Sequence, residues 1–450
     1  MKHSVLQKVF IVSLSLMLIV ISVGFGTGQK ASANSDSQKR TLKVLYWNAE
    51  AFNKTYGESF SKVYPDIDIQ VVTPGGMGAI TNYGALITKH SPDLVMLDPY
   101  NYKQLAKENK LVDLDSLIKR DKYDTTTLYP GLLDELKKQG GGQLYGLSPT
   151  VESYALLYNV DLFKKHKVKL PSDGMTWAEI LKLAGQFPTK GDKNSRIWGL
   201  SSFGSSNLVM DIARTEGLTY LDPNTLKATA NSTAWKNAYR SSIEATKSGV
   251  LDEGITLSAK SYLESSPFIM GRSAMTVAPI SRLKSLQSAK NGVKNYKPFT
   301  LGMVAGPADP KDRKSTGSAR VPEILAIPAN ATNVDAAWDF IKYFLGDDFA
   351  KEYYKSNSSA VDAPLSRMVK EYAGYKLDAF YKLRPNFDSS ISSYVLMNKS
   401  QNLELDFRSI LSRELKLAMD KKKTLDQAAA SIQKSTQIVV DKLKKVQQTK

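Results

Sequence analysis

Short apolar runs alternate with amphipathic stretches along the first part of the chain beyond residue 40. The runs at residues 41–48, 66–72 and 91–100 contain many β-branched, aliphatic and aromatic residues and predict strands. Apolar residues at helical spacing separate these runs, as across residues 49–63. Because strands and helices alternate, the pattern predicts an α/β layer with a mostly parallel sheet.

Polar and aromatic residues gather where these strands are expected to end. A glycine-rich turn at residues 73–81 follows the second strand. The residues after the first and third strands are Trp47, Asn48, Glu50, Asp98 and Tyr100. Ligands bind at the carboxyl ends of strands in open α/β sheets, so we expect these side chains to line one crevice.

The remainder of the chain continues this alternation up to a helical tail that starts near Leu403. Thr176 with Glu179 predicts a capping box at one helix start. Three glycines at residues 140–142 follow an amphipathic helix, and we interpret them as its end and a turn. They do not form a phosphate-binding loop, which requires a strand before it and Gly-Lys-Ser/Thr at its end. Neither an internal repeat nor a low-complexity linker is visible, so two domains would be joined by strands.

The first 33 residues have the pattern of a secretory signal peptide. Lys2 and Lys8 precede an apolar run at residues 9–23, and residues 31–33 read Ala-Ser-Ala. We expect cleavage after Ala33 and a secreted, extracellular protein. The alternative is an uncleaved anchor, because the apolar run approaches the length of a membrane span.

The composition is that of a globular protein and excludes several kinds of chemistry. Apolar residues make up 42% and charged residues 23% of the 450 residues, enough for two domains. The chain has no cysteine and only three histidines. Disulfides, thiolate metal sites and a lipid-modified cysteine are therefore excluded, and we expect no metal site, no cofactor and no Ser-His-Asp triad.

The net charge of +17 favours an anionic neighbourhood, such as cell-wall polymers, lipid headgroups or an acidic ligand. The alternative is that lysine serves only as a soluble surface residue. No compact basic stripe with interleaved aromatic residues is visible, so we expect no nucleic-acid binding.

Aromatic and acidic residues beyond the strands allow two kinds of site. The rings of Trp47, Tyr100, Tyr154 and Phe203 could stack on sugar faces, and the alternative is that they pack in the core. Glu50, Asp98 and Glu152 could supply a hydrolase with a carboxylate pair. Each could instead accept hydrogen bonds from ligand hydroxyls or form an ion pair between lobes.

Five sequence blocks, in order, resemble a known family. They are "SPDLVMLDPYNYKQLAKENKLVDL", "LYGLSPTVESYALLYNVDLFKKHKVKLPSDGMTWAEI", "GRSAMTVAP", "ILAIPANATNVDAAWDFIKYFL" and "TLDQAAASIQKSTQIV". Together they are similar to the extracellular solute-binding proteins of ABC importers, the carbohydrate-type family that includes maltose-binding protein. The resemblance covers residues 41–446.

The resemblance implies a periplasmic-binding-protein-like fold, in which two α/β lobes are joined by crossing hinge strands around a ligand cleft. The N-terminal lobe would comprise residues 41–150 and about 279–327. The C-terminal lobe would comprise residues 151–278 and about 328–450. The chain would cross between the lobes near residues 148–153, near 276–279 and again after Ile327.

The resemblance also implies the ligand-binding residues. From the first lobe it carries over Trp47, Asn48, Glu50, Asp98 and Tyr100. From the second lobe and the hinges it carries over Glu152, Tyr154, Phe203, Pro279 and Arg282, with Phe407 as a late aromatic at the lip of the cleft.

Two departures from the family pattern bear on the ligand and on attachment to the cell. Ile280 stands where the family usually has a tryptophan, so one stacking platform is missing, and Arg282, with Arg320 and Lys314, could meet an acidic sugar such as a uronate. The usual lipid-anchoring cysteine is also absent, so the protein would be released or held by charge or by an uncleaved signal.

We therefore expect a monomeric, non-enzymatic receptor that captures an oligosaccharide, neutral or acidic, by hinge closure. It would deliver this ligand to an ABC permease or a membrane sensor. One alternative is a polysaccharide lyase or hydrolase. Another is a wall- or membrane-associated adaptor that kept the fold without transport.

Overall fold

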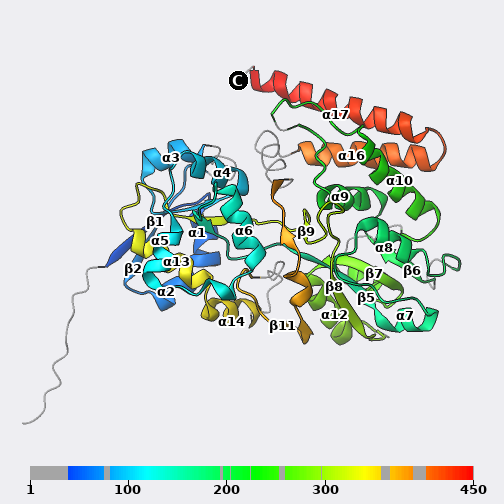
Figure 1. The fold of residues 1–450 in the computed structure, drawn as a ribbon, viewed down its shortest axis with the longest axis horizontal. Helices are drawn as coiled ribbons and strands as arrows, with labels where there is room; N and C mark the ends of the chain where they lie inside the picture. Colours follow the sequence, from blue (N-terminus) through cyan, green and yellow to red (C-terminus); the bar gives the residue numbers. More distant parts are fainter. Residues whose placement is uncertain are drawn as a thin grey trace, which may run out of the picture. The chain divides into compact units, whose positions relative to one another are not determined.

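Two separate β-sheets, each covered by its own helices, organise the chain (Figure 1). The computed structural model describes residues 39–75, 82–192, 196–202, 204–222, 224–252, 259–294, 296–355, 365–388 and 402–448. The expected signal peptide and its cleavage site lie outside these residues.

The first sheet has five strands in the order β2-β1-β3-β10-β4. Their bounds are β1 Arg40–Leu45, β2 Ile67–Val72, β3 Leu94–Leu97, β4 Gly146–Leu147 and β10 Ile324–Ala326. The strand β1 pairs in parallel with β2 and β3, as the alternating pattern predicted. The strand β10 arrives from a distant part of the chain and pairs antiparallel with both β3 and β4.

Helices of the first half of the chain surround this sheet, and two later helices join them. The expected helix over residues 49–63 is a continuous run of α1 (Ala49–Phe52), the π-helical η1 (Asn53–Gly57) and α2 (Glu58–Val63). The others are α3 (Tyr83–His90), α4 (Pro99–Lys107), α5 (Leu114–Asp121), η2 (Thr125–Thr127), α6 (Pro130–Gln139), α13 (Val334–Phe344) and α14 (Asp347–Lys355). The turn after α6 has φ of +73° at Gly141 and +106° at Gly142, which confirms that the glycines end the helix and form a turn.

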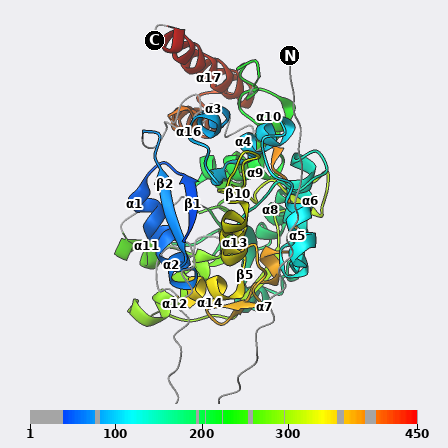
Figure 2. The ribbon, with the colours of Figure 1, turned by 90° about the vertical axis from the view of Figure 1, so that its left-hand side faces the viewer.

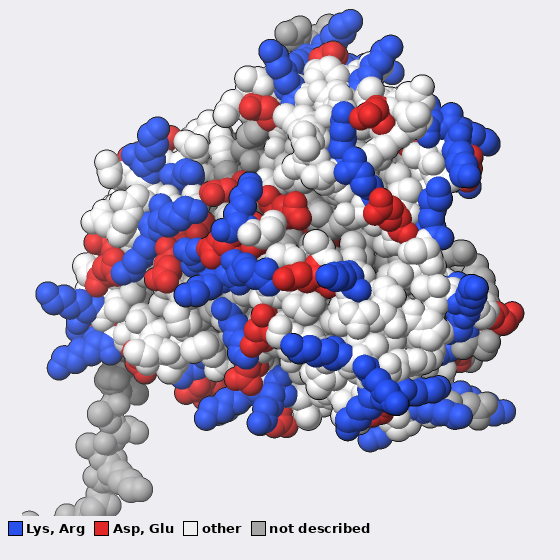
Figure 3. Space-filling view, turned by 45° about the vertical axis from the view of Figure 1, so that its right-hand side comes forward, with Lys and Arg blue, Asp and Glu red and all other residues white. Residues whose placement is uncertain are grey.

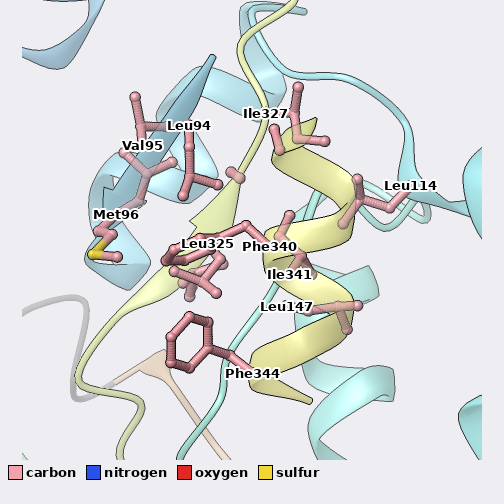
Figure 4. Close-up of a cluster of buried hydrophobic side chains, with 14 of the residues drawn as sticks. Leu94, Val95, Met96, Leu114, Leu147, Leu325, Ile327, Phe340, Ile341 and Phe344 are labelled. Atoms are coloured by element: carbon pink, nitrogen blue, oxygen red, sulfur yellow. The ribbon is translucent and has the colours of Figure 1, made fainter. Parts of the chain in front are cut away.

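Part of the first core, the buried cluster around the first sheet, lies between this sheet and α13. Phe340, Ile341 and Phe344 project from α13 toward Leu94 and Leu325 of the sheet (Figure 4). All five side chains are at most 1% exposed. The apolar face of α13 is therefore buried entirely in the first core.

The second sheet has four strands in the order β6-β7-β5-β8. Their bounds are β5 Tyr154–Asn159, β6 Trp198–Ser201, β7 Ser273–Pro279 and β8 Leu301–Ala305. The central strand β5 is antiparallel to both β7 and β8, whereas β6 and β7 are parallel.

Most of the remaining helices pack on the second sheet or on one another. They are α7 (Val160–His166), α8 (Trp177–Ala184), α9 (Ser205–Thr215), α10 (Thr233–Lys247), α11 (Ala259–Ser265), α12 (Ser281–Gly292), α16 (Leu403–Met419) and α17 (Leu425–Gln448). The last two lie side by side next to α9 and α10 (Figures 1 and 2). The Thr176–Glu179 capping box at the start of α8 is present, as predicted. The short elements are β9 (Ser315–Thr316), β11 (Glu371–Tyr372), β12 (Tyr375–Lys376), η3 (Asp378–Phe380) and β13 (Arg384–Pro385).

Two segments link the sheets directly, and one of them differs from expectation. Residues 148–153 lead from β4 in the first sheet to β5 in the second, as expected. The second link is formed by residues 306–323, between β8 and β10. The expected crossing near residues 276–279 is wrong, because these residues complete β7 within the second sheet.

The expected lobe boundaries change accordingly. The range 279–327 does not belong to the first lobe as a whole, since β8 pairs with β5 in the second sheet. The chain also does not leave the first lobe directly after Ile327, since α13 follows and packs in the first core. The physical reason is that the apolar face of α13 matches the first sheet, which already contains β10.

Candidate functional site

A pocket of about 390 Å³ opens beside the edge where β5 begins and β7 ends. The lining residues combine aromatic rings, hydroxyls, one amide, one carboxylate and three guanidinium groups. They are Tyr154, Asn207, Asp211, Arg214, Tyr262, Val277, Pro279, Ser281, Arg282, Ser285 and Arg408.

A tight strand-to-helix transition builds one wall of the pocket. Tyr154 at the start of β5 pairs with Pro279 at the end of β7. The helix α12 begins two residues later at Ser281, so Arg282 sits in its first turn. The intervening Ile280 is fully buried, and its apolar side chain anchors this turn in the core. Three sequence-predicted residues, Tyr154, Pro279 and Arg282, therefore come together.

The opposite wall comes from α9 and α16. Arg214 and Asp211, one turn apart on α9, form an ion pair of 3.3 Å. Arg408 reaches across from α16 and donates to the side-chain oxygen of Asn207 at 3.1 Å. A second contact from Arg408, to Glu404 at 2.8 Å, fixes its position on α16.

Arg282 has different surroundings from the other two arginines. It is only 7% exposed, and its guanidinium lies over the Tyr262 ring, 5.4 Å from the ring centre. One terminal nitrogen donates to the Tyr262 hydroxyl. The buried Nε has no hydrogen-bond acceptor among the residues that the structure describes.

The pocket also shifts the pKa values of two of its groups. Desolvation raises the pKa of Asp211, although the charges of Arg214 and Arg408 oppose this shift. Desolvation likewise raises the pKa of Tyr154, against the influence of Arg214 and Arg320. Burial therefore disfavours the charged form of both groups. The lining residues contain three guanidinium groups and one carboxylate.

Glu152 lies beside this pocket as part of a joint between the two linking segments. Its carboxylate accepts a hydrogen bond of 2.8 Å from Nε of Arg320. The two residues also exchange backbone hydrogen bonds of 2.7 and 2.8 Å. This is the ion-pair alternative considered for Glu152. Arg320 and Lys314, which were considered with Arg282 as partners of an acidic sugar, are not among the residues lining the pocket.

The predicted residues of the first half lie at the carboxyl ends of β1 and β3, which are neighbours in the sheet. Asn48 caps α1 by accepting from the backbone nitrogen of Ala51 at 2.7 Å, and Glu50 is exposed in the same turn. Asp98 caps α4 by accepting from the backbone nitrogen of Asn101 at 2.9 Å.

Two aromatic rings accompany these caps. The Trp47 ring lies 5.7 Å from that of Tyr46, and Tyr100 is half-buried in the first turn of α4. None of the five predicted residues of the first half lines the pocket described above. Their role in binding stays a prediction.

Two predicted aromatic residues have different outcomes. Phe203 lies outside the described residues. Phe407 is fully buried and stacks on Tyr220, with ring centres 4.3 Å apart. The expectation of a lip aromatic is therefore wrong for Phe407, because it sits on the core-facing side of α16.

The sequence did not predict most of the lining residues that lie on helices. Asn207, Asp211, Arg214, Tyr262 and Arg408 converge only through the packing of α9, α11 and α16. Arginines of this kind look like solvated helix residues in the sequence. Lysine and arginine side chains are scattered over the visible face of the molecule, with acidic residues and uncharged areas between them (Figure 3).

The described part of the chain offers no metal site and no membrane span. No group of three or more His, Asp or Glu side chains converges there. No helix within the same residues is both long and apolar enough to cross a bilayer.

Comparison with known proteins gives one family match and several matches in fold. Residues 44–372 match a family described as bacterial extracellular solute-binding protein. A sugar transporter from Rhizobium etli superposes with a TM-score of 0.55 at 19% identity, covering 88% of this chain and 98% of that one.

Two further solved structures are similar to a comparable degree. One is a family 1 extracellular solute-binding protein from Alicyclobacillus acidocaldarius, with a TM-score of 0.58 at 16% identity over 89% of this chain and 98% of the other. The other is the sugar-binding protein MalE from Xanthomonas citri, with a TM-score of 0.58 at 15% identity over 91% and 100%.

Proposed function

Because the chain belongs to the bacterial extracellular solute-binding protein family and has its two-lobe α/β fold, we propose that it is the saccharide receptor of an ABC importer. Proteins of this family bind solutes and are not enzymes, which removes the support for the lyase or hydrolase alternative. The saccharide and the importer are the parts of this statement that need a test.

The pocket beside Tyr154 is the observation that carries the proposal. Sugar sites combine apolar or aromatic walls with a few directed polar groups. Tyr154 and Tyr262 offer rings, whereas Asn207, Asp211 and Arg214 offer donors and acceptors within the same pocket. The solved relatives from Rhizobium etli and Xanthomonas citri are described as a sugar transporter and a sugar-binding protein, which agrees with this choice.

The remaining predicted residues fit the same proposal as the ligand contacts of the first lobe. Trp47, Asn48, Glu50, Asp98 and Tyr100 would contact the ligand from the ends of β1 and β3 when the lobes close. Glu152 would act at the joint between the linking segments. Closure follows if the ligand binds the closed arrangement more tightly than the open one.

We place the protein outside the cell, after removal of a signal peptide at Ala33. The family and the sequence pattern of the first residues support this location. A permease in the membrane would receive the closed, loaded receptor, which we expect to act as a monomer.

Thermal unfolding and calorimetry test the proposal. A saccharide present at 100 times its Kd should stabilise the folded protein by about 2.7 kcal/mol and raise the Tm. The panel should include neutral and acidic oligosaccharides, polyols and peptides. If no saccharide shifts the Tm or produces binding heat, the proposed function is wrong.

Substitution of Tyr154 connects binding to this pocket. Tyr154→Ala removes the ring and should weaken saccharide binding at least tenfold. Tyr154→Phe keeps the ring and loses only the hydroxyl, so it should retain most of the affinity. Equal affinity in all three proteins would place the site elsewhere.

A further inference from the structure

Arg282 is a buried cation without a counter-ion in the described part of the chain. No carboxylate there lies within ion-pair distance of its guanidinium, and its described polar contact is to the Tyr262 hydroxyl. An arginine keeps its charge at any physiological pH, so it cannot relieve the cost of burial by losing a proton. A buried charge is usually paired, because burying it without a partner costs free energy, and an anion in the pocket would supply that partner.

The other two arginines of the pocket are already compensated. Arg214 pairs with Asp211 at 3.3 Å, and Arg408 pairs with Glu404 at 2.8 Å. The lining residues still contain three arginines against one carboxylate. The excess positive charge is thus concentrated at Arg282.

One nearby feature strengthens this preference for a negative group. Arg282 lies in the first turn of α12, a helix of 12 residues whose N-terminus carries a partial positive charge.

We propose that the pocket selects an anionic saccharide, whose carboxylate or phosphate group pairs with Arg282 while its ring contacts Tyr154. This inference rests on the proposed function and narrows its ligand class. The guanidinium is a planar fork that matches both kinds of oxyanion. Nε of Arg282, which lacks an acceptor among the described residues, is a donor available to such a group.

Calorimetry with four probes tests the inference on the purified protein. Trigalacturonate represents a carboxylate sugar and its methyl ester the neutral equivalent, whereas glucose 6-phosphate represents a phosphate sugar and maltotriose a neutral glucan. We expect at least one of the two anionic probes to bind at least tenfold more tightly than both neutral probes. The comparison between the carboxylate and the phosphate probe then identifies which oxyanion is preferred.

Variants separate the charge of Arg282 from its structural contribution. Arg282→Gln should lower the affinity for the preferred anionic probe at least tenfold and change that for the neutral probes less than twofold. Arg282→Lys retains the charge but not the planar guanidinium group, so its affinity for the anionic probe should lie between those of the wild type and Arg282→Gln. Arg282→Lys also keeps the inference testable if Arg282→Gln does not fold.

Arg196→Gln is the matched control. Arg196 also lies over an aromatic ring, 3.9 Å from the centre of Trp198, and also has a buried Nε without an acceptor among the described residues. It does not line the pocket, so its substitution should leave all four affinities unchanged.

The outcomes distinguish this inference from the proposed function. Neutral probes that bind as tightly as the anionic ones, or an Arg282→Gln variant with unchanged affinity, would overturn the inference and leave a saccharide receptor. A panel in which no saccharide binds at all would reject both.

Discussion

Asp93 shows how one buried carboxylate holds distant segments together. It accepts hydrogen bonds from the backbone nitrogens of Lys43, Thr332 and Asn333 at 3.0, 2.9 and 2.8 Å. The first of these lies in β1 and the other two precede α13. Burial raises the pKa of Asp93, but these hydrogen bonds lower it more, so the pKa lies below its usual value. The ionised side chain therefore stabilises the folded first half.

Asp93→Asn should reduce the free energy of unfolding by about 3 kcal/mol at neutral pH, because hydrogen bonds to a charged group contribute about 1.5–3 kcal/mol each. Since the folded pKa is depressed, this stabilisation is present above the unfolded pKa of about 3.9 and is lost as the pH falls below it. Urea unfolding at pH 7 and near pH 3 measures both effects. The difference between wild type and variant should shrink at the lower pH, and a pH-independent difference would contradict the role of the charge.

Only part of the pocket could be predicted from the sequence. Tyr154 lies at a strand end, which periodicity can locate, whereas Pro279 and Arg282 were expected only from the resemblance to the family. Arg214 and Arg408 project from separate helices, and their meeting depends on tertiary packing that periodicity does not describe. Phe407 was misassigned although it falls at four-residue spacing with Leu403, Leu411 and Leu415, which are all buried. That spacing indicates a core face.

At the scale of elements, α13 determines which half of the chain its segment joins. Phe340 is fully buried, and its ring centre lies 4.9 Å from that of Phe60 and 4.6 Å from that of Phe344. The same helix packs against β1 and the neighbourhood of β10 (Figure 4). Because β10 belongs to this sheet and α13 is the next element along the chain, α13 packs in the first core.

Most helices and strands were predictable, but their assignment to a sheet was not. The alternation of β and α elements looks the same in both halves, so nothing in the sequence of β8 or α13 marks its partner sheet. The segment at residues 306–323 links the two larger sheets, but no strand within it belongs to either of them. It was not predicted, because the crossing was expected within β7.

Phe340→Ala should lower the free energy of unfolding by about 3–5 kcal/mol, since it removes a large ring and leaves a cavity in the first core. Leu405→Ala is the control, because Leu405 is 63% exposed on α16 and its loss should change stability by less than about 0.5 kcal/mol. Urea unfolding followed by tryptophan fluorescence compares the two. A cost below about 1 kcal/mol for Phe340→Ala would mean that the core collapses around the missing ring.

At the scale of the whole molecule, the two larger sheets are connected by few covalent paths, and the residues that line the pocket all come from the second sheet and the helices that pack with it. The linking segments at residues 148–153 and 306–323 meet through the ion pair between Glu152 and Arg320. We expect this joint to act as a hinge about which the two sheets move while the hydrogen bonds within each sheet are kept. On this proposal, binding is coupled to domain closure without rebuilding either core.

Small-angle X-ray scattering should detect this closure as a decrease in the radius of gyration when a saccharide found by calorimetry is added at saturation. A compact chain of this length has a radius of gyration of about 22 Å. Both forms should have larger values, and the value of the ligand-free protein should be the larger of the two. Arg282→Gln should require a higher concentration of an anionic saccharide for the same decrease, because it weakens binding but leaves the joint intact. If calorimetry reports saturation while the radius of gyration stays constant, the receptor binds without closing, because a ligand shifts a conformational equilibrium only through different affinities for its two states.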